Sequence, residues 1–270
     1  RVFGLLRDIT TTSLLGSSLL HDIFVVVLKI PHVFRRFFAE GAFSQAFIPV
    51  YNEYEEHKTA AETKEFINNL SGTLLTFLFG FTLLALFLAP IFILLFAPGF
   101  YFDPLKKDIA VDVLRIMFPY LGLISLVAFA GGIQNSHKKF SLPAATPVVF
   151  NLCIILSAFF LAPIFSVPIF GLAWGVLLAG IIQLLIQLAP LKQIDRLPIP
   201  RLDFNNQGVK KVFFLMLPAL LAGGVAQINS MIKTGTGSNK ATSRGPATFI
   251  VYNKDGHEYS LTRNVIFCPE

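Results

Sequence analysis

The sequence has few charged residues, few cysteines and a single tryptophan. Only 14% of its residues are charged and 54% are hydrophobic, whereas a typical soluble domain is about 25% charged. A mean hydropathy of +0.67 over 270 residues requires several apolar segments, because one buried helix cannot raise the mean of a whole chain that far. This composition excludes an ordinary soluble domain and indicates a protein that lies largely in lipid.

The scarcity of cysteine and the scatter of histidine exclude several kinds of site. Cys153 lies in an apolar run and Cys268 in a polar tail, so we predict two unpaired thiols rather than a disulfide framework. The histidines have no spacing typical of metal ligands, and we predict no metal and no other cofactor. The chain begins at Arg1 without the pattern of a signal peptide, which predicts a truncated start.

Long stretches without Asp, Glu, Lys or Arg dominate the middle of the chain. A helix needs about 20 apolar residues to cross a bilayer. Residues 67–102 predict one long helix whose far end is loosened by Pro90 and Pro98. Residues 116–137 predict a second helix.

Two further uncharged stretches follow. Residues 140–191 are too long for one crossing, and Pro163 and Pro168 bracket a turn near their middle, so they predict two helices. Residues 212–232 are just long enough to cross and predict the last helix.

The first fifty residues combine an apolar majority with recurring charges. This pattern is expected of helices that face lipid on one side and a wet interior on the other. We therefore predict two more helices, within residues 1–20 and 22–50. The predicted fold class is an all-α polytopic membrane protein of about seven transmembrane helices, of which the first is truncated.

Basic residues are distributed unevenly among the predicted loops. Cytoplasmic loops carry the excess of Lys and Arg. The loops after the second, fourth and sixth predicted helices contain Lys58, Lys64, Lys138, Lys139, Lys192, Arg196, Arg201, Lys210 and Lys211. The alternate loops contain only Lys106 and Lys107. We predict that the first set is cytoplasmic, which explains the net charge of +6 without nucleic acid as a partner.

Acidic residues also gather after the second predicted helix. This cluster consists of Glu53, Glu55, Glu56, Glu62 and Glu65. Acidic residues contribute little to membrane orientation, so we predict a solvated loop.

Charged side chains within the first forty residues form the candidate site. An ionised group at membrane depth costs several kcal/mol unless it is paired or faces water. On a helix, Arg1 and Arg7 share one broad face about 9 Å apart along the axis, so they can flank one extended anion. Arg35 from the next helix adds a third guanidinium, which matches phosphate oxygens better than an ammonium does. We predict that the three arginines bind a polyphosphate headgroup.

Asp22 is predicted to be a counter-charge or gate element. A nearby carboxylate lowers the self-repulsion of an empty cationic cavity. The alternative is a carboxylate at a helix start, favoured by the helix dipole. A supporting role, or else snorkelling to headgroups and mutual pairing, is assigned to Asp8, Lys29, Arg36 and Glu40. No acidic residue or histidine pairs with a plausible nucleophile, so an enzyme is not predicted.

The composition changes after residue 232. Residues 233–246 are rich in Gly, Ser and Thr and predict a linker. Residues 247–270 contain two β-prone runs on either side of an Asp-Gly pair, which predicts a β-hairpin tail. Gly235, Gly237 and Lys240 lack the spacing of a phosphate-binding loop, so nucleotide binding is not predicted.

Several segments together point to one family. The longest are RVFGLLRD and HDIFVVVLKIPHVFRRFFAEGAFSQAFIPVYNEY, within which FAEGAFSQAFIPV at residues 38–50 is highly specific. Shorter ones are APGF at 97–100, FPY at 118–120, N-x-x-x-[KR]-F-x-x-P at 135–143 and GLAWGV at 171–176. Residues 1–232, but nothing after them, closely resemble the MurJ (MviN) family of lipid II flippases.

The resemblance implies a function and a set of partners. In that family, two lobes with fourteen helices surround a cationic cavity, and alternating access moves lipid II from the inner to the outer leaflet. The chain would be the N-terminal lobe, in the bacterial inner membrane, with lipid II and membrane lipids as partners. Family arginines essential for transport match Arg1, Arg7 and Arg35, and an important aspartate matches Asp22.

The second lobe of such a transporter is missing from this chain, so we do not expect it to transport alone. Two alternatives stay open. One is an exporter of another polyprenyl-linked glycan or of an amphipathic drug. The other is a membrane-anchored binding fragment in which the hairpin is the functional part.

Overall fold

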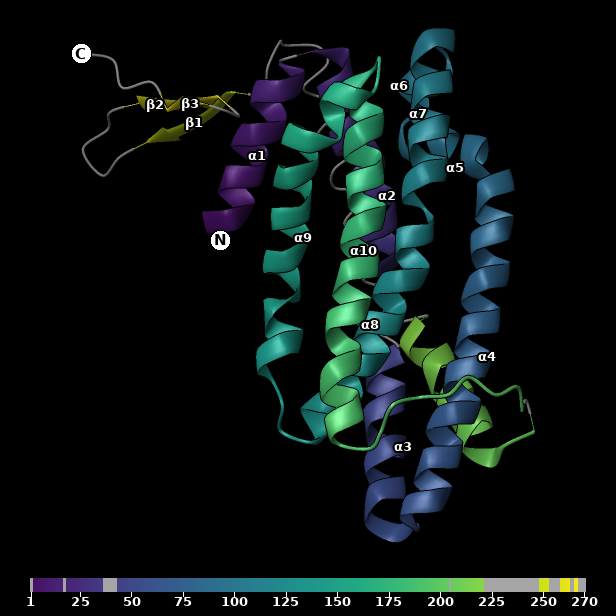
Figure 1. Ribbon diagram of the computed structural model, residues 1–270. Coiled ribbons are helices and arrows are strands. Elements are labelled where there is room, and N and C mark those ends of the chain that lie inside the picture. The colour runs from purple at the N-terminus through teal and green to yellow at the C-terminus, as the bar shows by residue number, and fades with distance from the viewer. Residues whose placement is uncertain are drawn as a thin grey trace. The chain divides into compact units, whose positions relative to one another are not determined.

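The computed structural model describes residues 2–16, 18–35, 43–203 and 205–220, and three strands within residues 248–266. It divides into two compact units, Arg1–Gly223 and Gly224–Glu270, which are described separately. In the described part of the first unit, every regular element is a helix (Figure 1). The predicted all-α membrane fold is confirmed.

The charged first fifty residues form helices, as predicted. Helix α1 spans Val2–Leu15, α2 spans Leu19–Arg35 and α3 spans Phe43–His57. Pro31 lies inside α2 and Pro49 inside α3. Residues 36–42 lie outside the described residues, so the helix predicted over 22–50 is described as two segments.

Helix α4 spans Ala60–Phe87 and begins with a capping box. The Thr59 hydroxyl accepts from the Glu62 backbone N–H, and the Glu62 carboxylate accepts from the Thr59 N–H at 2.9 Å. The helix ends at Phe87, and two short helices follow: α5 (Ala89–Phe96), with Pro90 in its first turn, and α6 (Pro98–Tyr101), which begins at Pro98. The two prolines therefore break the uncharged run where the sequence predicted.

Helices α7 (Pro104–Met117) and α8 (Pro119–Ser136) follow one another with one residue between them. The sequence predicted a helix only from residue 116, because charged residues interrupt the run before it. In the structure, Arg115 pairs with Asp112 at 3.3 Å along the surface of α7, so both charges are accommodated on the helix. The resulting helical stretch, Pro104–Ser136, begins two residues before Lys106, so Lys106 and Lys107, which were predicted to lie in a loop, lie in the first turn of α7.

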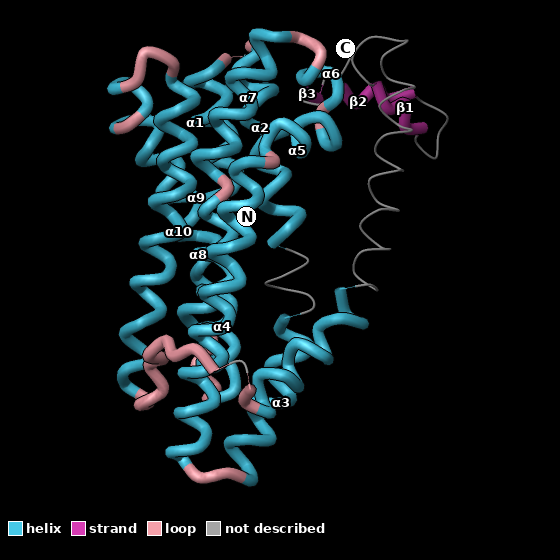
Figure 2. Tube along the Cα trace, turned by 90° about the vertical axis from the view of Figure 1, so that its right-hand side faces the viewer, coloured by secondary structure: helices cyan, strands magenta, loops and turns pink. Residues whose placement is uncertain are grey.

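Helices α9 (Ser141–Phe160) and α10 (Pro168–Gln193) form an antiparallel pair joined by the 3-10 turn η2 (Ala162–Ile164). This confirms the turn predicted between Pro163 and Pro168. The pair packs closely through glycine, because a Cβ added at Gly175 would lie 2.1 Å from Ser157 Oγ. Figures 1 and 2 show α8, α9 and α10 lying side by side. Residues 207–220 form a further helix.

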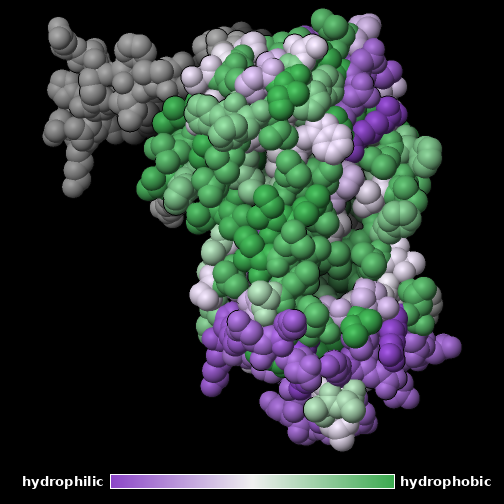
Figure 3. All heavy atoms as spheres, in the orientation of Figure 1, coloured by the Kyte–Doolittle hydropathy of each residue, from purple (hydrophilic) through white to green (hydrophobic). Residues whose placement is uncertain are grey.

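The helices form a membrane bundle. Four described stretches are long and apolar enough to cross a bilayer: Ala60–Phe87, Pro104–Ser136, Ser141–Ile164 and Pro168–Gln193. Figure 3 shows a broad apolar band over the middle of one face, with polar side chains gathered at the end formed by α3 and the start of α4. The α8–α9 turn and the end of α10 lie at this same end (Figure 1). The loops predicted to be cytoplasmic therefore share one end of the bundle, whereas the count of seven spans stays a prediction.

The second unit contains three short strands. Strand β1 (Thr248–Tyr252) pairs antiparallel with β2 (Glu258–Thr262), in a register that places Thr248 opposite Thr262. Strand β3 (Val265–Ile266) pairs antiparallel with β2. The pairing of β1 with β2 agrees with the hairpin predicted for the tail.

Candidate functional site

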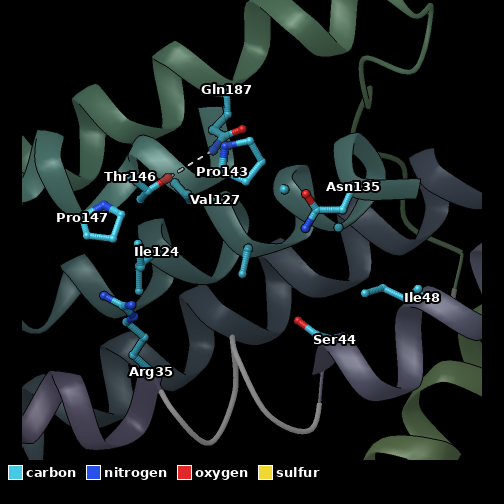
Figure 4. A pocket seen from close by; sticks show the side chains of 13 residues that line it. Arg35, Ser44, Ile48, Ile124, Val127, Asn135, Pro143, Thr146, Pro147 and Gln187 are labelled. Carbon is cyan, nitrogen blue, oxygen red and sulfur yellow. Dashed lines mark hydrogen bonds between the residues drawn. The ribbon is translucent and has the colours of Figure 1, made fainter. Parts of the chain in front are cut away.

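A cavity of about 280 Å³ lies between helices α2, α3, α8, α9 and α10 (Figure 4). Its polar lining residues come from every one of these helices and are Arg35, Ser44, Asn135, Thr146 and Gln187. Its apolar wall includes Ile48, Ile124, Val127, Pro143 and Pro147. A mostly apolar pocket with a few convergent polar groups is the usual form of a ligand site.

Arg35 is the last residue of α2, and its side chain extends into the cavity (Figure 4). Among the described residues that line the cavity, it carries the only charge. A guanidinium presents five donors in a planar fork that fits carboxylate and phosphate oxygens. The cavity is therefore suited to an anionic group.

Arg7 lies on α1 and pairs with its neighbour Asp8. Its Nε and Nη2 atoms donate to Asp8 Oδ1 at 2.9 and 2.6 Å. The Arg7 side chain is 24% exposed and the Asp8 side chain 62% exposed. Asp8, to which the sequence assigned only a supporting role, is thus the direct counter-charge of Arg7.

Of the remaining predicted site residues, two do not line the cavity and three lie outside the described residues. Asp22 lies in the first turn of α2 and is exposed, so both its predicted gate role and a helix-dipole role fit its position. Lys29 is exposed on the same helix. Arg1, Arg36 and Glu40 lie outside the described residues. The structure thus pairs Arg7 with Asp8 on helix α1. It places Arg35, on helix α2, in the cavity.

A ladder of buried amides supports the cavity wall, and one of its members, Gln187, also lines the cavity. Gln134 Nε2 donates to the side-chain oxygen of Gln187, and Gln187 Nε2 donates to Thr146 Oγ1 at 3.3 Å. Gln183 Nε2 donates to the Thr146 carbonyl oxygen at 2.8 Å. The three glutamines are at most 2% exposed.

The charge pattern of the sequence does not predict this ladder, because all of its side chains are neutral. Gln183 and Gln187 are four residues apart within an uncharged run, a spacing that places both on one face of a helix. That spacing was the available signal. The partners on α8 and α9 were not visible from it.

A second polar cluster fixes the polar end of the bundle. The Arg196 Nε atom donates to Glu55 Oε1 at 2.8 Å and its Nη2 to Oε2 at 3.2 Å. Tyr51 donates to Glu55 at 2.7 Å, and its hydroxyl lies 2.8 Å from His137 Nε2. The cluster ties α3 to the end of α8 and to the segment after α10. The prediction that Glu55 belongs to a solvated loop is therefore wrong, because the residue lies in a helix and has a partner distant in sequence.

Burial and hydrogen bonding shift the titration of this cluster. Burial raises the pKa of Glu55, but the hydrogen bonds from Arg196 and Tyr51 outweigh it, so the pKa lies below its usual range. The pKa of the Tyr51 hydroxyl is raised, first by burial and then by its bond to the Glu55 carboxylate. Glu55 and Arg196 are thus held as an ion pair. Within the described part of the chain, no group of three or more His, Cys, Asp or Glu side chains is arranged to hold a metal.

Comparison with known proteins gives consistent matches. A family described as "Lipid II flippase MurJ" matches residues 11–248, past position 232, where the sequence placed the end of the resemblance. A probable lipid II flippase MurJ of Buchnera aphidicola is 40% identical over 234 residues, covering 87% of this chain and 46% of that protein. The lipid II flippase MurJ of Burkholderia cenocepacia is 37% identical over 256 residues, covering 93% of this chain and 49% of that protein.

Solved structures agree with these relatives. A lipid II flippase MurJ in an inward closed conformation superposes with a TM-score of 0.70 at 26% identity, covering 86% of this chain and 47% of that one. The chain spans about half the length of the curated relatives it matches.

Proposed function

Because the chain belongs to the MurJ family of lipid II flippases, we propose that it forms one lobe of a flippase that carries lipid II from the inner to the outer leaflet of the bacterial inner membrane. The relatives are named as flippases, which favours transport rather than catalysis. The observation that carries the proposal most directly is Arg35 on the wall of a cavity between membrane helices. A charge that lines a cavity among apolar helices is costly, and such a residue is by default a candidate for a substrate pathway.

The cationic groups suit the pyrophosphate of lipid II. Arg35 lines the cavity, and Arg7 is held by Asp8 in the structure. An incoming pyrophosphate competes with the Asp8 carboxylate for the same donors on Arg7. Arg1 and Asp22 remain part of this proposed cationic site through the family resemblance.

We propose that transport needs the second lobe as a partner. Alternating access requires two bodies that rock about a shared site. The chain matches about half of each relative, so the other half supplies the opposite wall of the cavity. The lobe alone is expected to bind lipid II without translocating it.

A hybrid protein tests the proposal. The matched half of the Burkholderia cenocepacia flippase is replaced by this chain, and the hybrid is expressed in cells depleted of their own flippase. We expect the hybrid to support growth, and we expect neither half alone to do so. A hybrid that reaches the membrane at normal levels but never supports growth would contradict the proposed function.

A further inference from the structure

Besides Arg35, the polar groups that line the cavity are neutral. Figure 4 shows Arg35 on one side and Thr146 and Gln187 joined by a hydrogen bond on another, with Asn135 farther along the lining, beyond Pro143. The cavity thus presents two chemically different surfaces. A cation faces it from α2, and hydroxyl and amide groups face it from α8, α9 and α10.

The hydrogen bonds that the Thr146 hydroxyl already makes determine which ligand group fits beside it. A hydroxyl has one donor and two acceptor lone pairs. The Thr146 hydroxyl donates to the Leu142 carbonyl at 3.3 Å and accepts from Gln187 Nε2 at 3.3 Å. One acceptor lone pair of the hydroxyl remains, and it can accept a hydrogen bond from an O–H or N–H of a ligand. It does not fit an oxygen of an ionised phosphate, because that oxygen is itself only an acceptor.

The acceptor at Thr146 is held in place from behind. The Gln187 side chain is fixed between Gln134 and Thr146, and Gln183 binds the Thr146 carbonyl. All three glutamines are buried, so the ladder has little freedom to rearrange. A binding group supported by a second layer of hydrogen bonds is preorganised for its ligand.

The size of the cavity limits what it holds. Small-molecule sites usually enclose about 300–1,000 Å³, and this cavity encloses about 280 Å³. The part of the cavity that lies on this lobe is therefore large enough for the region of the headgroup where the pyrophosphate meets the glycan.

Together these features point to a second subsite. We propose that Thr146 binds a hydroxyl or amide N–H of the glycan-peptide part of the headgroup while Arg35 binds its pyrophosphate, and that Asn135, which lines the same cavity, contacts the glycan-peptide part as well. The inference rests on the proposed function and deepens it, because it divides one cavity between an anionic and a neutral part of the same ligand. The subsite makes the lobe prefer a glycosylated lipid pyrophosphate over the bare one.

Binding to the purified chain in lipid nanodiscs tests this division. The two probes are lipid II and undecaprenyl pyrophosphate, which lacks the glycan and peptide. We expect Thr146→Val to weaken lipid II binding about 3- to 10-fold, as loss of one hydrogen bond implies, and to leave undecaprenyl pyrophosphate unchanged. Thr146→Ser keeps the hydroxyl and is expected to bind both probes like the original chain.

Two further variants separate the subsite from general damage. Thr76→Val is the matched control, because Thr76 makes the same backbone hydrogen bond to the residue four positions earlier but lies on α4, outside the cavity lining. Asn135→Leu alters an exposed lining residue without removing a buried contact and is expected to show the same selective loss as Thr146→Val. It keeps the inference testable if Thr146→Val does not fold.

The outcomes distinguish a failure of the proposed function from a failure of the subsite alone. If the unaltered chain binds neither probe, the proposed function fails and the subsite fails with it. If the chain binds both probes but folded variants at Thr146 and Asn135 lose nothing, or lose both probes equally, only the subsite is overturned.

Discussion

Replacing Arg196 by glutamine is expected to loosen the polar end of the bundle. Arg196 makes two hydrogen bonds to the carboxylate of Glu55, a residue 141 positions away in the sequence. The side chains of Arg196 and Glu55 are 13% and 25% exposed. The pair joins α3 to the segment that follows α10, so its loss frees two elements that are not neighbours in the chain.

The magnitude follows from burial and geometry. Hydrogen bonds to charged groups contribute about 1.5–3 kcal/mol, and the partial exposure of Glu55 lowers this to a coupling energy of about 1–2 kcal/mol. For a unit of this size, that corresponds to a fall in Tm of about 3–6 °C. Lys58 and Glu62 form a matched control pair, because their nitrogen and oxygen lie 3.9 Å apart and both side chains are half-exposed. We expect less than about 0.5 kcal/mol of coupling there.

The assay is a double-mutant cycle. Melting temperatures in detergent are measured for Glu55→Gln, Arg196→Gln and the double variant, and the same cycle is made at Lys58 and Glu62. We expect the two single changes at the buried pair to be strongly non-additive. Additive effects at Glu55 and Arg196, or equal coupling at the exposed pair, would refute the reasoning.

The same ion pair makes stability depend on pH. The pKa of Glu55 is lower in the folded protein than its ordinary value, so the stabilisation is complete above that ordinary value and is lost as pH falls through the lowered one. We therefore expect the Tm difference between the original chain and Glu55→Gln to shrink as pH falls below about 4, where the carboxylate becomes protonated. A difference that grows in that acidic range would contradict this sign.

Two further predictions concern packing and orientation. Gly175→Ala is expected to lower Tm by several degrees because the new Cβ would lie 2.1 Å from Ser157 Oγ, whereas Gly80→Ala meets nothing within 4 Å and is expected to be neutral or slightly stabilising; thermal melting compares them. In a background without native cysteines, a membrane-impermeant maleimide is expected to label Lys138→Cys only from the cytoplasmic side and Lys106→Cys only from the opposite side. Labelling of both from one side would overturn the orientation.

Much of the bundle could be predicted from the sequence because lipid imposes a simple rule on spans. Uncharged runs located α4, α9 and α10, and prolines located their ends. The rule failed for α7, where Arg115 and Asp112 interrupt the run but pair with each other on the helix surface. Charge counting cannot distinguish a loop from a helix whose charges neutralise one another.

The candidate site was predictable only in part. Arg35 could be predicted as a site residue because a charge in an apolar segment is costly unless it has a role. The structure places its side chain in the cavity. The contribution of Gln187 and Thr146 to the wall depends on contacts between α9 and α10 and was not visible from either helix alone. The same holds for Glu55, whose partner Arg196 follows α10 and is distant in sequence.

The most direct test of the central claim is lipid II translocation by the hybrid flippase carrying Arg35→Ala. Lipid II that reaches the outer leaflet is measured by its accessibility to an externally added lipid II-cleaving toxin, at matched protein levels. The control is Arg115→Ala, which removes an arginine that pairs on the surface of α7. The account predicts that Arg35→Ala abolishes translocation while Arg115→Ala preserves it. Normal translocation by the Arg35→Ala hybrid would contradict the assignment of this cavity to the substrate.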